Sequence, residues 1–326
     1  MVTTSNTPEA AAPPPRSRRV AVVVWTAAVV FGGSLMGVQA RMNGELATVS
    51  GDWSWAALVS FGGGLMLLAF AAMTSKRRAL ALPRIVAAVR QGRLAWWHTI
   101  AGLSGALFVV VQATVAPVLG VAILTIAFVA GQTIGGLAAD RFGFGAGGVE
   151  RISVPRLAGG ALVVVAVLVS VAGRLEGGFA WWLLILPVIS GFFVAFQQAF
   201  NGRVRVQTDV FAATLGNFFI GTMALALVFA VHGALVAGPF DWFGAPWYVY
   251  LGGVAGVIGV PIAAVAVGTI GVLRLALALV TGQLVGSLVL DLTLPLATTA
   301  VTAWTYVGLA LAFVAIVITS VRWGRR

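Results

Sequence analysis

Ten long apolar segments follow one another along this chain of 326 residues, and they restrict it to one broad class of fold. Hydrophobic residues make up 60% of the sequence, charged residues only 9%, and the mean hydropathy is +1.03. A hydrocarbon core needs about 20 apolar residues per helix, and a soluble protein could not bury this much apolar surface. The predicted fold class is therefore an all-α polytopic membrane protein. The predicted transmembrane helices are 20–40, 55–74, 96–115, 119–139, 157–173, 181–200, 211–231, 247–267, 272–290 and 301–321.

The basic residues predict the orientation of these helices. With the N-terminus inside, 18 of the 20 Lys and Arg residues fall on the cytoplasmic side, and only Arg41 and Arg174 fall outside. Because basic residues concentrate in cytoplasmic loops, ten spans with both termini inside are favoured. Residues 1–19 are then a disordered cytoplasmic tail, and residues 322–326 are a second cytoplasmic tail. The expected location is the cytoplasmic membrane of a bacterium.

Composition also excludes several classes of function. The net charge of +11 comes from basic residues between apolar segments, so we expect membrane lipid around the chain and no nucleic-acid partner. The absence of cysteine excludes disulfides, thiol catalysis and cysteine-bound metals. The sequence has no phosphate-binding loop, no His-Glu-x-x-His and no paired carboxylates at membrane depth. We therefore expect neither an ATP-driven pump nor an enzyme, and no cofactor or metal.

The apolar segments repeat in two halves, 20–174 and 181–321. Three polar motifs occur once in each half, in the same order. They are Gln39-x-x-x-Asn43-Gly44 with Gln197-x-x-x-Asn201-Gly202, Ser60-Phe61-x-x-Gly64 with Asn217-Phe218-x-x-Gly221, and Gly131-Gln132-x-x-Gly135 with Gly282-Gln283-x-x-Gly286. The offset falls from about 158 to 151 because the first half has a longer basic loop, Lys76 to Arg93. Five spans is an odd number, so the second half enters the membrane upside down as an inverted repeat.

Gln132 and Gln283 are the leading candidates for a central site. Each lies about 8–13 residues into its span, near the membrane midplane at 1.5 Å per residue. Inverted repeats bring such positions together at the axis, where carriers bind substrate. The alternative is that these glycine-flanked motifs are packing motifs and that each glutamine only bridges helices.

The other amides form a second group of candidates. Gln39 with Asn43, and Gln197 with Asn201, share a helix face at i, i+4 spacing and lie near span ends, as gates at opposite mouths would. Alternatively, each Asn-Gly simply ends its helix. Two further equivalent polar residues either line a cavity or hydrogen-bond between helices. They are Ser60 and Asn217.

Ionisable residues are few and lie near span ends. Asp140 and Asp291 follow the two Gly-Gln motifs, and they either take part in function or cap helices and pair with loops. Glu45 is the candidate for coupling to protons, although Arg41 four residues earlier favours a local ion pair. His98 and His232 are expected at the membrane interface.

These paired motifs, in ten spans and two inverted halves, resemble the drug/metabolite transporter superfamily (an EamA-like inverted repeat) and its YdcZ-like branch in a fused two-copy form. The resemblance covers residues 20–321. It implies a central cavity inside spans 1–4 and 6–9, with spans 5 and 10 packed outside, where they assist formation of a homodimer. The residues that it implies line or gate this cavity are Gln39, Asn43, Gln132, Gln197, Asn201 and Gln283.

The predicted function is secondary transport of small metabolites or hydrophobic, drug-like compounds by alternating access, with H⁺ or another ion as the candidate driving partner. The alternative is a non-transporting scaffold or sensor. That alternative predicts that Gln132 and Gln283 face neighbouring helices rather than a cavity.

Overall fold

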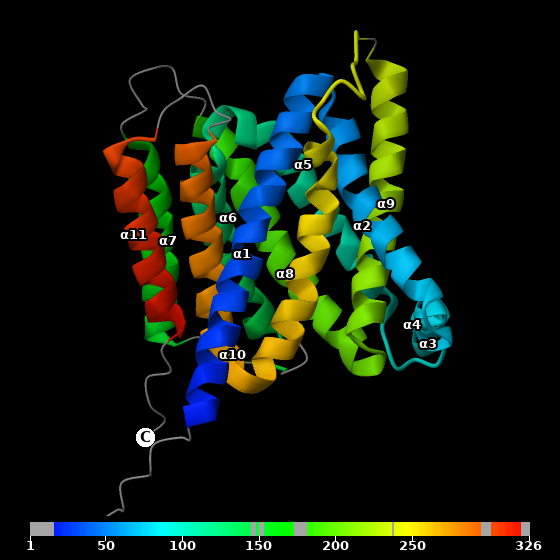
Figure 1. The fold of residues 1–326 in the computed structure, drawn as a ribbon. Helices are drawn as coiled ribbons and strands as arrows, with labels where there is room; N and C mark the ends of the chain where they lie inside the picture. The colour runs from blue at the N-terminus through cyan, green and yellow to red at the C-terminus, as the bar shows by residue number, and fades with distance from the viewer. Residues whose placement is uncertain are drawn as a thin grey trace, which may run out of the picture.

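The computed structural model describes residues 16–144, 148–149, 153–172, 181–236, 238–294 and 301–320. These residues form helices and connections, without strands (Figure 1). Residues 1–15 and 322–326, predicted as tails, lie outside the described residues. The long helices are α1 (Arg16–Ser50), α2 (Trp53–Met73), α5 (Gly102–Leu119), α6 (Val121–Phe142), α7 (Val154–Val171), α8 (Ile185–Gln207), α9 (Val210–Leu235), α10 (Gly252–Thr293) and α11 (Ala303–Ser320). Short 3₁₀ turns precede α5, α8 and α10. They are η1 (Trp96–Ala101), η3 (Trp181–Leu184) and η4 (Trp247–Leu251).

Eight segments among the described residues are long and apolar enough to cross a membrane, and Trp247–Gly259 and Ala303–Ile318 are shorter apolar helices. The predicted separation of 247–267 from 272–290 was wrong as a helix boundary, because α10 is continuous through both. Its 42 residues would extend about 63 Å if straight, roughly twice the hydrocarbon thickness. Figure 1 shows instead that α10 bends into two limbs, gold and orange.

The predicted ends of the first helix were also wrong. α1 begins at Arg16, within the predicted tail, and continues beyond residue 40 to Ser50. The Asn43-Gly44 pair therefore lies inside a helix, and α8 likewise passes through Asn201-Gly202. Tertiary packing of both helices outweighs the weak helix propensity of Asn and Gly at these positions.

The basic segment between the second and third predicted spans is helical rather than a loop. It forms α3 (Lys76–Ala79) and α4 (Ala81–Arg90). Ala81, Ile85 and Ala88 recur at helical spacing, and all three are buried in a cluster that includes Leu215 of α9. This apolar stripe docks α4 against α9, and α4 lies at one end of the bundle (Figure 1).

Helices far apart in the sequence pack against each other: α1 along α10, α6 along α8, α2 along α9 and α7 along α11. The two Gly-Gln motifs lie in the first two of these contacts. A Cβ atom on Gly282 would overlap the carbonyl oxygen of Val30, and one on Gly131 would overlap that of Val188. Both motifs therefore allow close approach of backbones, the usual role of small residues between membrane helices.

The α2–α9 contact is built from matched phenylalanines. The rings of Phe61 and Phe218 stack with centroids 4.8 Å apart. A Cβ on Gly64 would strike the Phe218 ring, and a Cβ on Gly221 would strike the Phe61 ring. Each aromatic side chain thus fills the space left by the glycine of the opposite motif.

We predict that Gly131→Ala lowers the melting temperature of the purified protein by several degrees, because relieving an overpacked contact costs about 1–3 kcal/mol. The matched control is Gly136→Ala in the same helix, where a Cβ meets nothing within 4 Å. This control should leave the melting temperature unchanged or slightly higher, since alanine is the better helix former. An equal fall in melting temperature in both variants would contradict the close contact between Gly131 and Val188.

Candidate functional site

Buried amides gather where α1, α2 and α5 meet. Gln39 and Asn43 lie one turn apart in α1 and are 5% and 1% exposed. Gln39 Nε2 donates to Ser60 Oγ at 3.3 Å, and Asn43 Nδ2 donates to Gln112 Oε1 at 2.8 Å. The predicted shared face is confirmed, and the interpretation of Asn43-Gly44 as a helix stop was wrong.

The matching residues of the second segment form a similar cluster. Gln197 Nε2 and Asn201 Nδ2 both donate to Asn217 Oδ1, at 2.7 and 3.3 Å. Asn217 thus takes the position that Ser60 has in the first cluster. The position that corresponds to Gln112 at the offset of 151 is Ala263, so the second cluster has no equivalent amide.

The sequence analysis missed Gln112. This side chain is fully buried in α5, and its Nε2 has no hydrogen-bond partner among the described residues. The Oδ1 atom of Asn43, its neighbour, is also unpaired. The available signal was a glutamine near the end of the apolar segment 96–115, but this residue has no polar counterpart in the second half.

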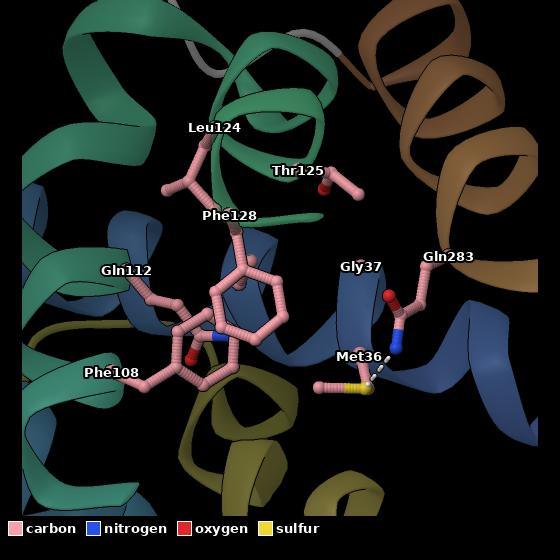
Figure 2. A pocket seen from close by; sticks show the side chains of 9 residues that line it. Met36, Gly37, Phe108, Gln112, Leu124, Thr125, Phe128 and Gln283 are labelled. Carbon is pink, nitrogen blue, oxygen red and sulfur yellow. Dashed lines mark hydrogen bonds between the residues drawn. The ribbon is translucent and has the colours of Figure 1, made fainter. Parts of the chain in front are cut away.

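A small cavity lies beside these amides, between α1, α5, α6 and α10 (Figure 2). Its volume is about 10 Å³, which is close to the space that one water molecule needs. Gln283 Nε2 donates to Met36 Sδ at 2.8 Å, and Gln283 Oε1 is buried without a partner. The cavity is lined by Met36, Gly37, Ala40, Phe108, Gln112, Leu124, Thr125, Phe128 and Gln283.

The lining is apolar with a few neutral hydrogen-bonding groups. The rings of Phe108 and Phe128 stack at 4.2 Å and form one wall. Gln112, Thr125 and Gln283 supply the polar groups, and the described lining includes no charged side chain. Such a surface suits a neutral group that both donates and accepts hydrogen bonds.

Gln132 lies elsewhere. It is half-buried on α6, it does not line the cavity, and it makes no hydrogen bond to the described residues. The glycines beside it pack against α8. The structure therefore brings Gln283, but not Gln132, to the cavity with Gln112.

The acidic candidates are engaged in capping and ion pairs. Asp291 accepts hydrogen bonds from Val121 and Ala122 N–H at 2.9 and 2.8 Å, and so caps the N-terminus of α6. Asp140, at the matching position, pairs with Arg156 at 2.6 Å. Asp291 is thus a helix cap, and Asp140 takes part in an ion pair.

At the end of the bundle where α1 ends, Glu45 pairs with Arg41 and accepts a hydrogen bond from Tyr248. The local ion pair expected at i, i+4 is confirmed. His98 lies in η1, half-buried against Phe200. His232, near the end of α9, contacts Asp52, a fully buried residue that the sequence analysis missed.

Comparison with known families decides the class of protein. The family model described as "Putative inner membrane exporter, YdcZ" matches residues 24–169 and, a second time, residues 182–318. The chain belongs to this YdcZ family. Together the two matches cover well over half of the sequence, which confirms the resemblance to the two-copy form. No curated protein matches the chain.

Membership of the YdcZ family, together with the apolar helices, makes the chain a multi-pass inner membrane protein of an exporter family. Membrane location and a general role in transport are thereby confirmed. The family is one of exporters and not of enzymes.

We predict that Asn43→Ala and Gln112→Ala are coupled in a double-mutant cycle of unfolding free energy. Hydrogen bonds between membrane helices contribute about 0.6 kcal/mol on average and up to about 1.7. The coupling should fall in this range because the two amides bond directly at 2.8 Å. Asn43→Ala combined with Gln198→Ala, an exposed glutamine on α8, should be additive. Additivity of the first pair would contradict the bond.

Proposed function

We propose that this chain is a secondary transporter of small metabolites or hydrophobic, drug-like compounds, and that it works by alternating access. The observation that carries the proposal is the small cavity between α1, α5, α6 and α10. Gln112 Nε2 and Gln283 Oε1 are buried beside it, and neither has a hydrogen-bond partner in the part of the chain that the structure describes. Unpaired amide atoms are costly in a membrane interior, so a bound group that satisfies them would be stabilised.

The two matched segments are proposed to be inverted five-helix halves, with ten spans in all and two of them within α10. Paired contacts support this arrangement. Gly102 of the first half approaches the Asn217 carbonyl, and Gly253 of the second approaches the Ser60 carbonyl. Each contact has a counterpart with the halves exchanged, as a twofold axis in the membrane plane would produce.

The cavity is too small for cargo in this conformation, so transport requires the helices around it to separate. We propose that the Asn43–Gln112 bond holds α1 to α5 and closes one mouth. Asn201 lies at the matching position of the second half and bonds only within the α8–α9 pair. The two mouths are therefore closed by different contacts.

The cavity lining also restricts the cargo. A fixed charge would meet no counter-charge among the described lining residues, whereas a neutral group with a donor and an acceptor could pair with Gln283 Oε1 and Gln112 Nε2. We propose that Gln132 takes the place of Gln283 when the opposite mouth is closed, because the two occupy matching positions.

A scaffold or sensor remains the second candidate, and one observation favours it. Gln39 with Ser60, and Gln197 with Asn217, are paired amide contacts between helices, as structural bridges would be. This reading leaves the unpaired atoms of Gln112 and Gln283 without a role.

We predict that a thermal-shift screen of the full-length protein, against a panel of neutral, zwitterionic and lipophilic cationic compounds, identifies stabilising ligands. A ligand at 100 times its Kd stabilises by about 2.7 kcal/mol. Gln283→Leu and Gln112→Leu should lose this shift, whereas Gln198→Leu, on an exposed face, should keep it. Ligands that still stabilise both cavity variants would place the site elsewhere. A panel with no stabilising compound would favour the scaffold.

The proposed orientation is tested by labelling, because the native chain has no cysteine. Lys76→Cys and Asp241→Cys place single thiols at exposed positions at opposite ends of the bundle. An impermeant maleimide added to intact cells should label residue 241 and reach residue 76 only after lysis. The reverse pattern would invert the proposed topology.

A further inference from the structure

A buried carboxylate lies at the end of the bundle where α1 ends and α2 begins. Asp52 is fully buried at the N-cap of α2. Its Oδ1 accepts hydrogen bonds from the backbone N–H groups of Ser54 and Trp55, at 2.9 and 3.2 Å, and from Ser54 Oγ at 2.6 Å. Its Oδ2 is buried and has no hydrogen-bond partner among the described residues. A charge that is only partly satisfied in this way is costly unless a cation lies nearby.

His232, near the end of α9, is the neighbouring group that becomes such a cation when it is protonated. Its Nδ1 lies 3.4 Å from Asp52 Oδ1 and 3.2 Å from Ser54 Oγ. Because the Ser54 hydroxyl donates its hydrogen to Asp52, its oxygen accepts from the ring, and Nδ1 carries a hydrogen.

The other ring nitrogen is where a second proton can add. Nε2 of His232 makes no hydrogen bond to the described residues, and 16% of the side chain remains exposed. Histidine is the side chain that ordinarily changes charge between pH 5 and 8. Protonation at Nε2 would convert the ring to an imidazolium whose Nδ1–H faces the carboxylate.

We propose that Asp52 and His232 form a proton-binding site that latches α2 to α9. A proton from water adds to Nε2, and the resulting imidazolium pairs with the Asp52 carboxylate. No covalent bond other than N–H forms. The ion pair exists only in the protonated form, so the latch is strongest at acid pH and weakens as the pH rises.

The opposite end of the same helix pair has a latch that does not titrate in this range. Asp209 caps α9 through Ala212 N–H at 2.8 Å, and it pairs with Arg84 at 2.9 Å and Arg77 at 3.4 Å. Asp209 lies 157 residues after Asp52, which is the offset between Ser60 and Asn217. The two aspartates are therefore matching caps with different cationic partners.

The partners decide how each latch responds to pH. Partial burial of Asp209 opposes its charge, but hydrogen bonds from Ala212 and Arg84, with the charges of Arg84 and Arg77, lower the pKa of its carboxyl below the ordinary value. Arginine stays charged throughout. Of the two ends, only the Asp52 end has a histidine, the side chain that ordinarily changes charge between pH 5 and 8.

Other charged groups at the Asp52 end are accounted for. Asp241 lies in the connection after α9, where its N–H donates to Ser50 O at 3.1 Å and its carboxylate folds back beside Gly244. Glu45 of α1 pairs with Arg41 and Tyr248. Asp52 is thus the carboxylate in direct contact with His232 among the described residues.

Proton binding at this site does not depend on the proposed transport, but its consequence for transport does. In an alternating-access carrier, a latch that tightens with acid favours the conformation that is closed at this end. The ion pairs of Asp209 do not change over this pH range. A change in pH would therefore shift the equilibrium between the two conformations in one direction.

The direct test is nitrogen NMR of full-length protein labelled on histidine, since the chain has only two histidines. His98→Gln assigns the two signals. We expect the His232 ring to gain its second proton between pH 8 and 5. At pH 6, a smaller fraction of Asp52→Asn molecules should hold this proton. A His232 ring that stays neutral at pH 5, or is indifferent to Asp52→Asn, would overturn the proposal.

Thermal unfolding provides a second test. Between pH 5.5 and pH 8, the melting temperature of the native protein should fall by about 2–4 °C more than that of His232→Gln. This is the change in melting temperature expected when one such interaction is lost. The matched variant Arg84→Gln, at the opposite end, should retain the native pH dependence. Identical pH profiles for the native protein and His232→Gln would refute the latch. Neither test measures transport, so failure of the proposed function would leave both results intact.

Discussion

Close backbone contact at glycine is the constraint on which the rest of the structure depends. Lipid chains are as apolar as leucine, so membrane helices gain little by burying apolar side chains against each other and rely on close packing. Gly282 against Val30, and Gly131 against Val188, bring helices of the two matched segments together at backbone distance. These contacts fix α1 beside α10 and α6 beside α8, and so determine which polar side chains meet.

Polar side chains in this interior divide into two kinds. Gln39, Gln197 and Asn217 complete hydrogen bonds between helices and contribute to cohesion. Gln112 and Gln283 each have a buried atom with no hydrogen-bond partner among the described residues, beside a small cavity between their helices. An amide atom that already has a partner gains little from a ligand, whereas a buried atom without a partner gains a hydrogen bond. Gln112 and Gln283 are therefore the residues that point to a bound ligand.

The apolar pattern predicted the helical class and the approximate course of most long helices, since apolar runs of about 20 residues satisfy their own backbone hydrogen bonds in lipid as helices. It wrongly divided α10 into two helices. Helix ends were harder to predict. Asn43-Gly44 ends a helix only where no tertiary packing stabilises the residues that follow, and here α1 continues to Ser50. The partner of Gln112 could not be predicted, because it depends on how α1 crosses α5. Asp52 was predictable, since Asp209 matches it at the offset of the neighbouring motif.

Departures from the repeat are as informative as the repeat itself. Perfect twofold symmetry between the proposed halves would give both ends of the bundle the same contacts and hence equal stability. This chain breaks the symmetry at matched positions: Gln112 corresponds to Ala263, and Asp52 faces a histidine where Asp209 faces arginines. A carrier whose two mouths close with unequal free energy has a preferred resting conformation. Two copies in one chain make such a difference possible, because each copy has its own stretch of sequence and can change alone.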